Sequence, residues 1–79
     1  MEKFTLEILS KNKYGALNRI TGLYTRKGYN IDWITSKEAE SDEFLILVIT
    51  SRGDSYAQTY IVRQLEKLYD VIDVTLIKE

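Results

Sequence analysis

The chain has 79 residues, so it has room for a single domain, residues 1–79, with a small core of its own. It contains no cysteine and no histidine, which excludes disulfides, cysteine-based metal sites, thiolate nucleophiles and the commonest general base. Its net charge of −1 does not favour a polyanionic partner, and no apolar run approaches the ~20 residues of a membrane span, so we expect a protein that binds neither nucleic acid nor membrane. The lack of cysteine fits a reducing compartment, so we expect a cytoplasmic location.

The first predicted strand and helix are joined by a polar turn. Residues 4–9 alternate between apolar and polar side chains, as a half-buried strand does. Residues 16–27 carry apolar side chains at helical spacing, and Gly28 suits a left-handed helix stop. The turn from Asn12 to Gly15 opens this helix, and free backbone N–H groups there can receive a small anion such as a carboxylate. The alternative is that Asn12 is only a helix cap and Gly15 only a turn glycine.

The middle of the chain predicts a hairpin. Residues 29–36 form its first strand, with Ile31 and Trp33 expected on one face. Residues 38–43 are an acidic connection, interpreted as a solvated loop because they lack the ligand spacing of a calcium site. Residues 44–50 are apolar on both faces of the second strand, which predicts that something covers the second face of the sheet as well.

The last third predicts a helix and a closing strand. The sequence Ser55-Tyr56-Ala57-Gln58 has the form of a capping box, so the second helix is expected to begin at Ser55. Residues 71–77 form the last strand. The order β-α-β-β-α-β predicts an α+β, ferredoxin-like fold: a four-stranded antiparallel sheet with two helices on one face. An open apolar sheet face or strand edge marks an interaction surface, so we expect at least a homodimer.

The residue types argue against an enzyme. No Ser–His or Cys–His pair can exist, and we expect no catalytic residue, no metal site and no cofactor. The carboxylate pairs Asp70 with Asp73 and Asp32 with Glu38 are interpreted as ordinary solvated charges.

Two classes of binding module remain. An RNA-binding module has the same order of elements and stacks bases on aromatics such as Phe44 and Trp33, but the third strand lacks the basic-aromatic-glycine signature of that class. A small-molecule module would use the Asn12 turn of one subunit and Asn30 of a neighbour. An amino acid suits such a site: its carboxylate would accept from helix-start N–H groups, and the two asparagine amides would bridge its polar ends.

Two motifs together extend over nearly the whole chain. The first is Asn12-x-x-Gly15-Ala16-Leu17 followed by Ile20-x-Gly22-Leu23-Tyr24-x-Arg26-x-Gly28-Tyr29-Asn30-Ile31, and the second is Gln64-Leu65-x-Lys67-Leu68-x-Asp70-Val71. In these motifs the sequence resembles the ACT domain of acetolactate (acetohydroxyacid) synthase small subunits.

This resemblance implies a regulatory, non-catalytic subunit in branched-chain amino-acid biosynthesis. Such a subunit binds and activates a catalytic subunit, to which the thiamine diphosphate and magnesium would belong. The resemblance also implies a homodimer of ACT domains paired side by side, with the feedback effector valine at the pairing interface. The effector-binding residues map here to Asn12, Gly15, Ala16, Asn30 and Ile31.

Three features depart from the pattern of the family. The sequence ends at Glu79, where most members continue, which implies a short form without the C-terminal domain. Tyr14 replaces a small residue or proline beside the predicted pocket, and Trp33 replaces a small polar residue on the pairing strand. The identity of the effector, the retention of feedback control, the oligomer size and the surface facing the catalytic subunit therefore stay open, and a free-standing amino-acid-sensing module is the alternative.

Overall fold

The computed structural model describes residues 2–77, which form six elements in the expected order. These are β1 (Lys3–Lys11), α1 (Ala16–Arg26), β2 (Ile31–Lys37), β3 (Phe44–Arg52), α2 (Ser55–Glu66) and β4 (Val71–Ile77). The type and order of every predicted element are confirmed. Within residues 2–77, neither helix has the length and apolar character that crossing a membrane requires.

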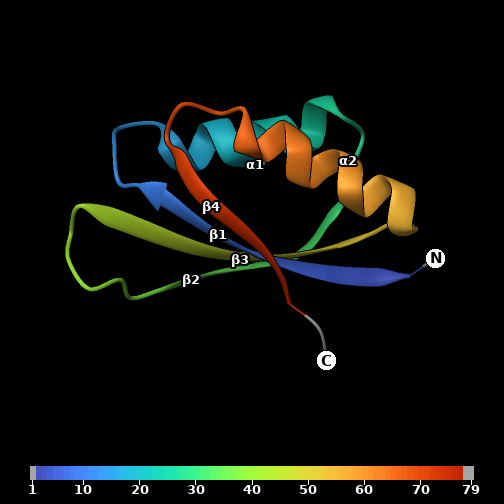
Figure 1. The fold of residues 1–79 in the computed structure, drawn as a ribbon, viewed down its shortest axis with the longest axis horizontal. Helices are drawn as coiled ribbons and strands as arrows, with labels where there is room; N and C mark the ends of the chain where they lie inside the picture. The colour runs from blue at the N-terminus through green and yellow to red at the C-terminus, as the bar shows by residue number, and fades with distance from the viewer. Residues whose placement is uncertain (1, 78–79) are drawn as a thin grey trace.

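The four strands form one antiparallel sheet in the order β2-β3-β1-β4. Figure 1 shows both helices on the same face of this sheet. The arrangement confirms the ferredoxin-like fold, and it makes β2 and β4 the two edge strands. Each edge strand presents a row of backbone groups that can pair with another chain.

The core lies between the sheet and the helices. Alternate residues of β1 and β3 point into it because side chains on a strand alternate between the two faces. The helices contribute the apolar stripes that their spacing predicted. The buried hydrophobic cluster comprises Phe4, Leu6, Ile8, Ile20, Leu23, Tyr24, Leu47, Ile49, Ile61 and Leu65.

The opposite face of the sheet, here called the open face, has no helix or strand over it within residues 2–77 (Figure 1). Its apolar side chains include Phe44, Ile46 and Val48 of β3, as the two-sided apolar pattern of that strand required. Polar pairs interrupt this surface. The hydroxyl groups of Thr5 and Thr50 are hydrogen-bonded at 2.8 Å across β1 and β3, and Lys37 Nζ is 2.9 Å from a carboxylate oxygen of Glu7.

A β-bulge near the start of β2 changes which residues share a face. Ile31 pairs with Ser51, whereas Trp33 pairs with Thr50, so Asp32 is an additional residue on the β2 side. Ile31 therefore packs against the core and Trp33 lies on the open face, exposed over 66% of its surface. The prediction that Ile31 and Trp33 share one face was wrong, because the alternation restarts at the bulge.

Both helix starts differ in their caps from the sequence interpretation. Gly15 occupies the N-cap position of α1, without a side-chain cap, and Asn12 donates through Nδ2 to the carbonyl of Asp42 at 3.0 Å instead. α2 begins at Ser55 as predicted, but its cap is Asp54, whose Oδ1 accepts from the Ala57 N–H at 2.9 Å. Aspartate caps a helix at least as well as serine, and the residue before Ser55 supplies it.

Candidate functional site

The start of α1 carries unsatisfied backbone donors. Ala16 N–H donates to the carbonyl of Lys13 at 3.0 Å, and Arg19 N–H donates to the carbonyl of Gly15 at 2.9 Å. For the N–H groups of Leu17 and Asn18, between these two, the structure of residues 2–77 contains no hydrogen-bond acceptor. Two free donors at the positive end of a helix dipole favour a carboxylate or another small anion.

Glycine is required at position 15 for two reasons. Its φ of 82° lies in the left-handed region, which residues other than glycine rarely adopt. A Cβ atom at this position would also lie 2.9 Å from Nη1 of Arg19. That guanidinium is held in place, since its Nη2 donates to the carbonyl of Tyr14 at 3.2 Å and it is also bonded to Asp70. The turn and the guanidinium therefore fit together only because residue 15 has no side chain.

Asp70 is a structural residue that the sequence interpretation missed. Its carboxylate is buried and forms an ion pair with Arg19, whose Nε donates to Oδ2 at 2.8 Å. Its carbonyl accepts from Lys11 N–H at 2.8 Å and from the hydroxyl of Ser10 at 3.2 Å. The expectation that Asp70 and Asp73 form a pair of solvated charges was wrong for Asp70, which joins the starts of β4 and α1 to the end of β1. Asp73 is exposed.

Asn12 lies beside this helix start, at the end of β1. Its backbone N–H donates to the carbonyl of Glu43 at 2.8 Å, so both the backbone and the side chain of Asn12 are fastened to the loop between β2 and β3. An open hollow of about 430 Å³ adjoins it, lined by Lys11, Asn12, Lys13, Glu43 and Phe44. Tyr14, expected to crowd the predicted pocket, is fully exposed to solvent.

Asn30 and Ile31 lie at the opposite end of α1. That helix has 11 residues, so about 16 Å of helix separates its two ends. The structure thus brings Asn12, Gly15 and Ala16 together at one end and leaves Asn30 and Ile31 at the other, with Asn30 next to the edge strand β2. Among the expected effector-binding residues, the two asparagines do not meet within one chain.

Asn30 belongs to a small polar cluster at the start of β2. Its Nδ2 donates to Oδ1 of Asp32 at 3.0 Å, and Nε of Arg52 donates to Oδ2 of the same carboxylate at 2.7 Å. The hydrogen bond from Arg52 is the main reason that the pKa of Asp32 lies below its ordinary value. Asp32 is therefore an ion-paired residue, and its interpretation as a solvated partner of Glu38 was wrong.

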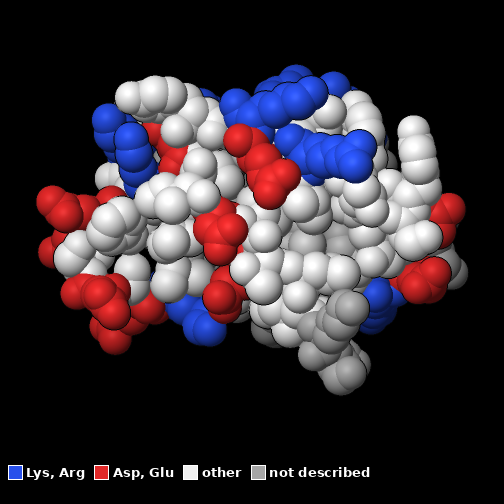
Figure 2. Space-filling view, viewed as in Figure 1, with Lys and Arg blue, Asp and Glu red and all other residues white. Residues whose placement is uncertain are grey.

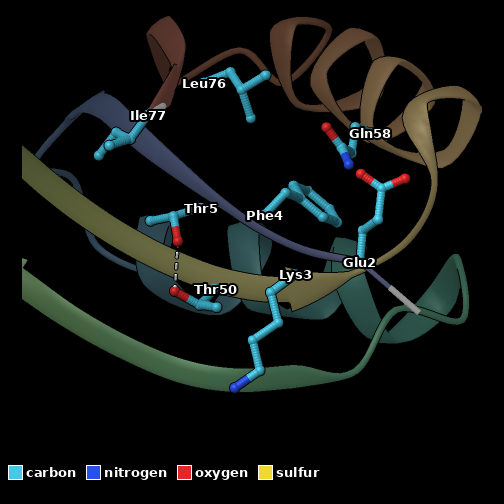
Figure 3. Close-up of a pocket in the computed structure, with 8 residues that line it drawn as sticks. All are labelled: Glu2, Lys3, Phe4, Thr5, Thr50, Gln58, Leu76 and Ile77. Atoms are coloured by element: carbon cyan, nitrogen blue, oxygen red, sulfur yellow. Dashed lines mark hydrogen bonds between the residues drawn. The ribbon is translucent and has the colours of Figure 1, made fainter. Parts of the chain in front are cut away.

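A larger hollow, of about 640 Å³, lies far from the start of α1. Figure 3 shows it between β1, β3, β4 and α2, with Phe4 in its interior. Its neutral polar groups bond within the chain: Thr5 pairs with Thr50, and Gln58 Nε2 donates to the carbonyl of Gly53 at 2.9 Å. It is lined by Glu2, Lys3, Phe4, Thr5, Thr50, Gln58, Leu76 and Ile77.

The RNA-binding alternative finds little support in the chemistry of the open face. Phe44 and Trp33 do lie there, as that alternative requires. However, Lys37 is paired with the carboxylate of Glu7, and this neutralises a cation that a phosphate backbone would need. For a metal ion, residues 2–77 contain no group of three or more potential acidic ligands in a suitable arrangement.

Comparison with known proteins gives one consistent result. The family model described as "AHAS small subunit-like ACT domain" matches residues 6–73. The acetolactate synthase small subunit of Buchnera aphidicola subsp. Baizongia pistaciae is 39% identical over 79 residues, which is 100% of this chain and 50% of that protein. The acetolactate synthase isozyme 3 small subunit of Escherichia coli K12 is 36% identical over 70 residues, 89% of this chain and 43% of that protein.

A solved structure agrees with these sequence relatives. The crystal structure of the acetolactate synthase small subunit from Thermotoga maritima superposes with a TM-score of 0.91 at 33% identity. The alignment covers 99% of this chain and 48% of that one. The present chain therefore spans about half the length of the relatives that it matches.

Proposed function

Since the chain belongs to the AHAS small subunit-like ACT domain family, we propose that it is a regulatory, non-catalytic subunit of acetolactate synthase, in branched-chain amino-acid biosynthesis. The match over residues 6–73 is the observation that carries this proposal. The partner is a catalytic subunit, which holds the thiamine diphosphate and magnesium, and the effect of binding is to raise the activity of that subunit.

Two copies pair through their β2 edges. β2 is an edge strand whose residues from Trp33 to Lys37 are exposed, so its outer backbone groups are available to a second strand. A two-fold axis makes the two β2 strands antiparallel and extends the sheet across the interface. The start of β2 in one copy then lies beside the end of β2 in the other, which is the end at which α1 begins.

This pairing unites the two halves of the effector site. Asn30 of one copy approaches the α1 start of its partner, where Leu17 and Asn18 have free N–H groups. These N–H groups bind the carboxylate of an amino acid. Each asparagine donates within its own chain through Nδ2, so its Oδ1 can accept from the ammonium group. Valine, the effector that the family resemblance implies, is the amino acid proposed.

A complementation experiment tests the shared site. Asn12→Ala and Asn30→Ala each remove one half of it, so neither variant alone should bind valine in calorimetry, whereas the exposed α2 variant Thr59→Ala should bind normally. A mixed pair keeps one intact site, and random pairing of equal amounts should restore about a quarter of the wild-type sites. Restoration requires a site shared between chains. Normal binding by either single variant would overturn the assignment.

The regulatory role has its own test. The protein is added to the acetolactate synthase catalytic subunit of the same organism, and activity and co-elution are measured with and without valine. Stimulation and co-elution are expected. The absence of both stimulation and co-elution over a wide range of concentrations would overturn the regulatory role. Valine binding in that case would indicate the free-standing amino-acid-sensing module instead.

A further inference from the structure

The charges of this chain are separated along its sequence and in space. Residues 8–31 contain no acidic residue, while Lys11, Lys13, Arg19, Arg26 and Lys27 all lie among them. The loop between β2 and β3, residues 38–43, contains Glu38, Glu40, Asp42 and Glu43 and no basic residue. Figure 2 shows this acidic loop at one end of the molecule and basic side chains gathered over the helices. Such a separation gives a single copy a positive and a negative region.

The acidic loop finds no ionic partner in its own described chain. The ion pairs of residues 2–77 are Arg19–Asp70, Lys37–Glu7 and Arg52–Asp32, and no loop carboxylate takes part in them. Lysines do lie at the same end of the sheet, but Lys11 Nζ is 4.9 Å and Lys13 Nζ is 5.8 Å from the ring centroid of Tyr69. Neither lysine forms an ion pair with a loop carboxylate within residues 2–77.

The C-terminal end of α1 has the opposite character. Arg26 ends the helix and Lys27 follows it, both exposed, and neither forms an ion pair within residues 2–77. Lys27 Nζ lies 5.9 Å from the ring centroid of Tyr60. This basic end precedes the first residue of β2, Ile31, whereas the acidic loop follows the last residue of β2, Lys37. One edge strand therefore has positive charge before it and negative charge after it.

We infer that the acidic loop of one copy docks on the basic end of α1 in a second copy, and that this contact sets the orientation of the pair. The inference rests on the β2 pairing of the proposed function. In an antiparallel pair, Glu38 and Glu40 of each copy lie next to Arg26 and Lys27 of the other, twice by symmetry. A parallel pair would place loop against loop and basic end against basic end.

Opposite charges in this contact should set the orientation of the pair, whereas like charges brought together there should weaken it. Each exposed ion pair contributes little by itself, because water and salt screen it. Complementary surface charge steers two copies into the matching arrangement and penalises the arrangement with like charges in contact. The backbone pairing of β2 supplies the remaining stabilisation, and antiparallel pairing is itself slightly the more stable of the two arrangements.

Charge reversal with rescue tests the contact. Arg26→Glu with Lys27→Glu places acidic residues at both sides of the contact, and Glu38→Lys with Glu40→Lys places basic residues there. By sedimentation at low salt, each double variant should dimerise at least about tenfold more weakly than the wild type. An equimolar mixture of the two should form a heterodimer of near wild-type strength. Arg63→Glu with Lys67→Glu, on the α2 side near the β4 edge, is the matched control and should dimerise normally.

The possible results distinguish failure of the charge contact from failure of the β2 pairing on which it rests. Wild-type protein that stays monomeric would overturn both the β2 pairing and the charge contact. Wild-type protein that dimerises while both variants dimerise equally well would overturn the contact alone. Salt provides a second measurement that needs no variant: the wild-type dissociation constant should rise with sodium chloride, and a constant value would also count against the contact.

Discussion

Arg19 of α1 and Asp70 at the start of β4, 51 residues apart in sequence, form the ion pair that fixes the start of α1 on the body of the domain. The carboxylate of Asp70 is 7% exposed and the side chain of Arg19 is 49% exposed. The pair is therefore asymmetric, since the cation can be hydrated from one side and the anion cannot.

This asymmetry predicts unequal costs for removing the two partners. Arg19→Met leaves a buried carboxylate without its cation and should lower the free energy of unfolding by about 2–4 kcal/mol. Asp70→Asn leaves a guanidinium that reaches water and should cost about 1–2 kcal/mol. Urea unfolding of both variants measures the difference. Equal costs, or a larger cost for Asp70→Asn, would contradict the asymmetry.

Three glycines allow a matched test of the turn at the start of α1. Gly15→Ala incurs both the strain of a positive φ and the contact with Arg19, so it should destabilise by about 2 kcal/mol. Gly28 has the same φ of 82° and open space around a Cβ atom, so Gly28→Ala should cost only about 1 kcal/mol. Gly22→Ala, inside α1, should stabilise by about 0.5–1 kcal/mol. Thermal unfolding of the three variants checks this order.

Two tyrosines that pack in or against the core should respond oppositely to loss of their hydroxyl group. The hydroxyl of Tyr24 is buried without a hydrogen-bond partner in residues 2–77, so Tyr24→Phe should leave stability unchanged or raise it by up to about 1 kcal/mol. The hydroxyl of Tyr29 donates to the carbonyl of Ala57 at 2.6 Å, so Tyr29→Phe should cost about 1 kcal/mol. Chemical denaturation at neutral pH distinguishes the two.

The same hydroxyl groups predict an alkaline limit to stability. Burial raises the pKa of Tyr24 above its ordinary value, and the neighbouring Tyr29 adds to the rise. A pKa raised by folding gives stability that is fully present below the unfolded-state pKa of about 10 and is lost as the pH rises beyond it. Tyr24→Phe should therefore lose less stability than the wild type between about pH 8 and pH 11. Parallel curves for the two proteins would refute this.

Asp32 predicts an acid-side dependence. The hydrogen bond from Arg52 lowers the pKa of Asp32, so this contribution to stability is complete above the unfolded-state value of about 3.9 and is lost as the pH falls through the lower folded-state pKa. Arg52→Met removes the hydrogen bond, and its stability should fall less steeply than that of the wild type below about pH 4. Acid titration followed by circular dichroism makes the comparison, with Arg63→Met as the control for loss of an exposed cation.

The regular elements could be predicted from sequence because their signals are local. The alternation in residues 4–9 and the helical spacing in residues 16–27 each reflect one buried face, and the sheet buries those same faces. Their order alone limited the topology to a few possibilities, of which the ferredoxin-like fold is the observed one.

The errors concern partners that are distant in sequence or a shift of register. Asn12 could not be assigned from its neighbours because its acceptor, the carbonyl of Asp42, lies 30 residues away. Asp70 is charged and stands in a turn, and only the fold shows that Arg19 covers it. The bulge at Asp32 inverts the face of Ile31, and periodicity does not signal one extra residue in so short a strand.

On the open face, apolar side chains are interrupted by hydroxyl groups and by oppositely charged side chains, as in the contacts Thr5–Thr50 and Glu7–Lys37. When a bound partner dissociates, exposing such a mixed surface to water costs less free energy than exposing a purely apolar one. We therefore expect a partner on this face to bind reversibly and not permanently.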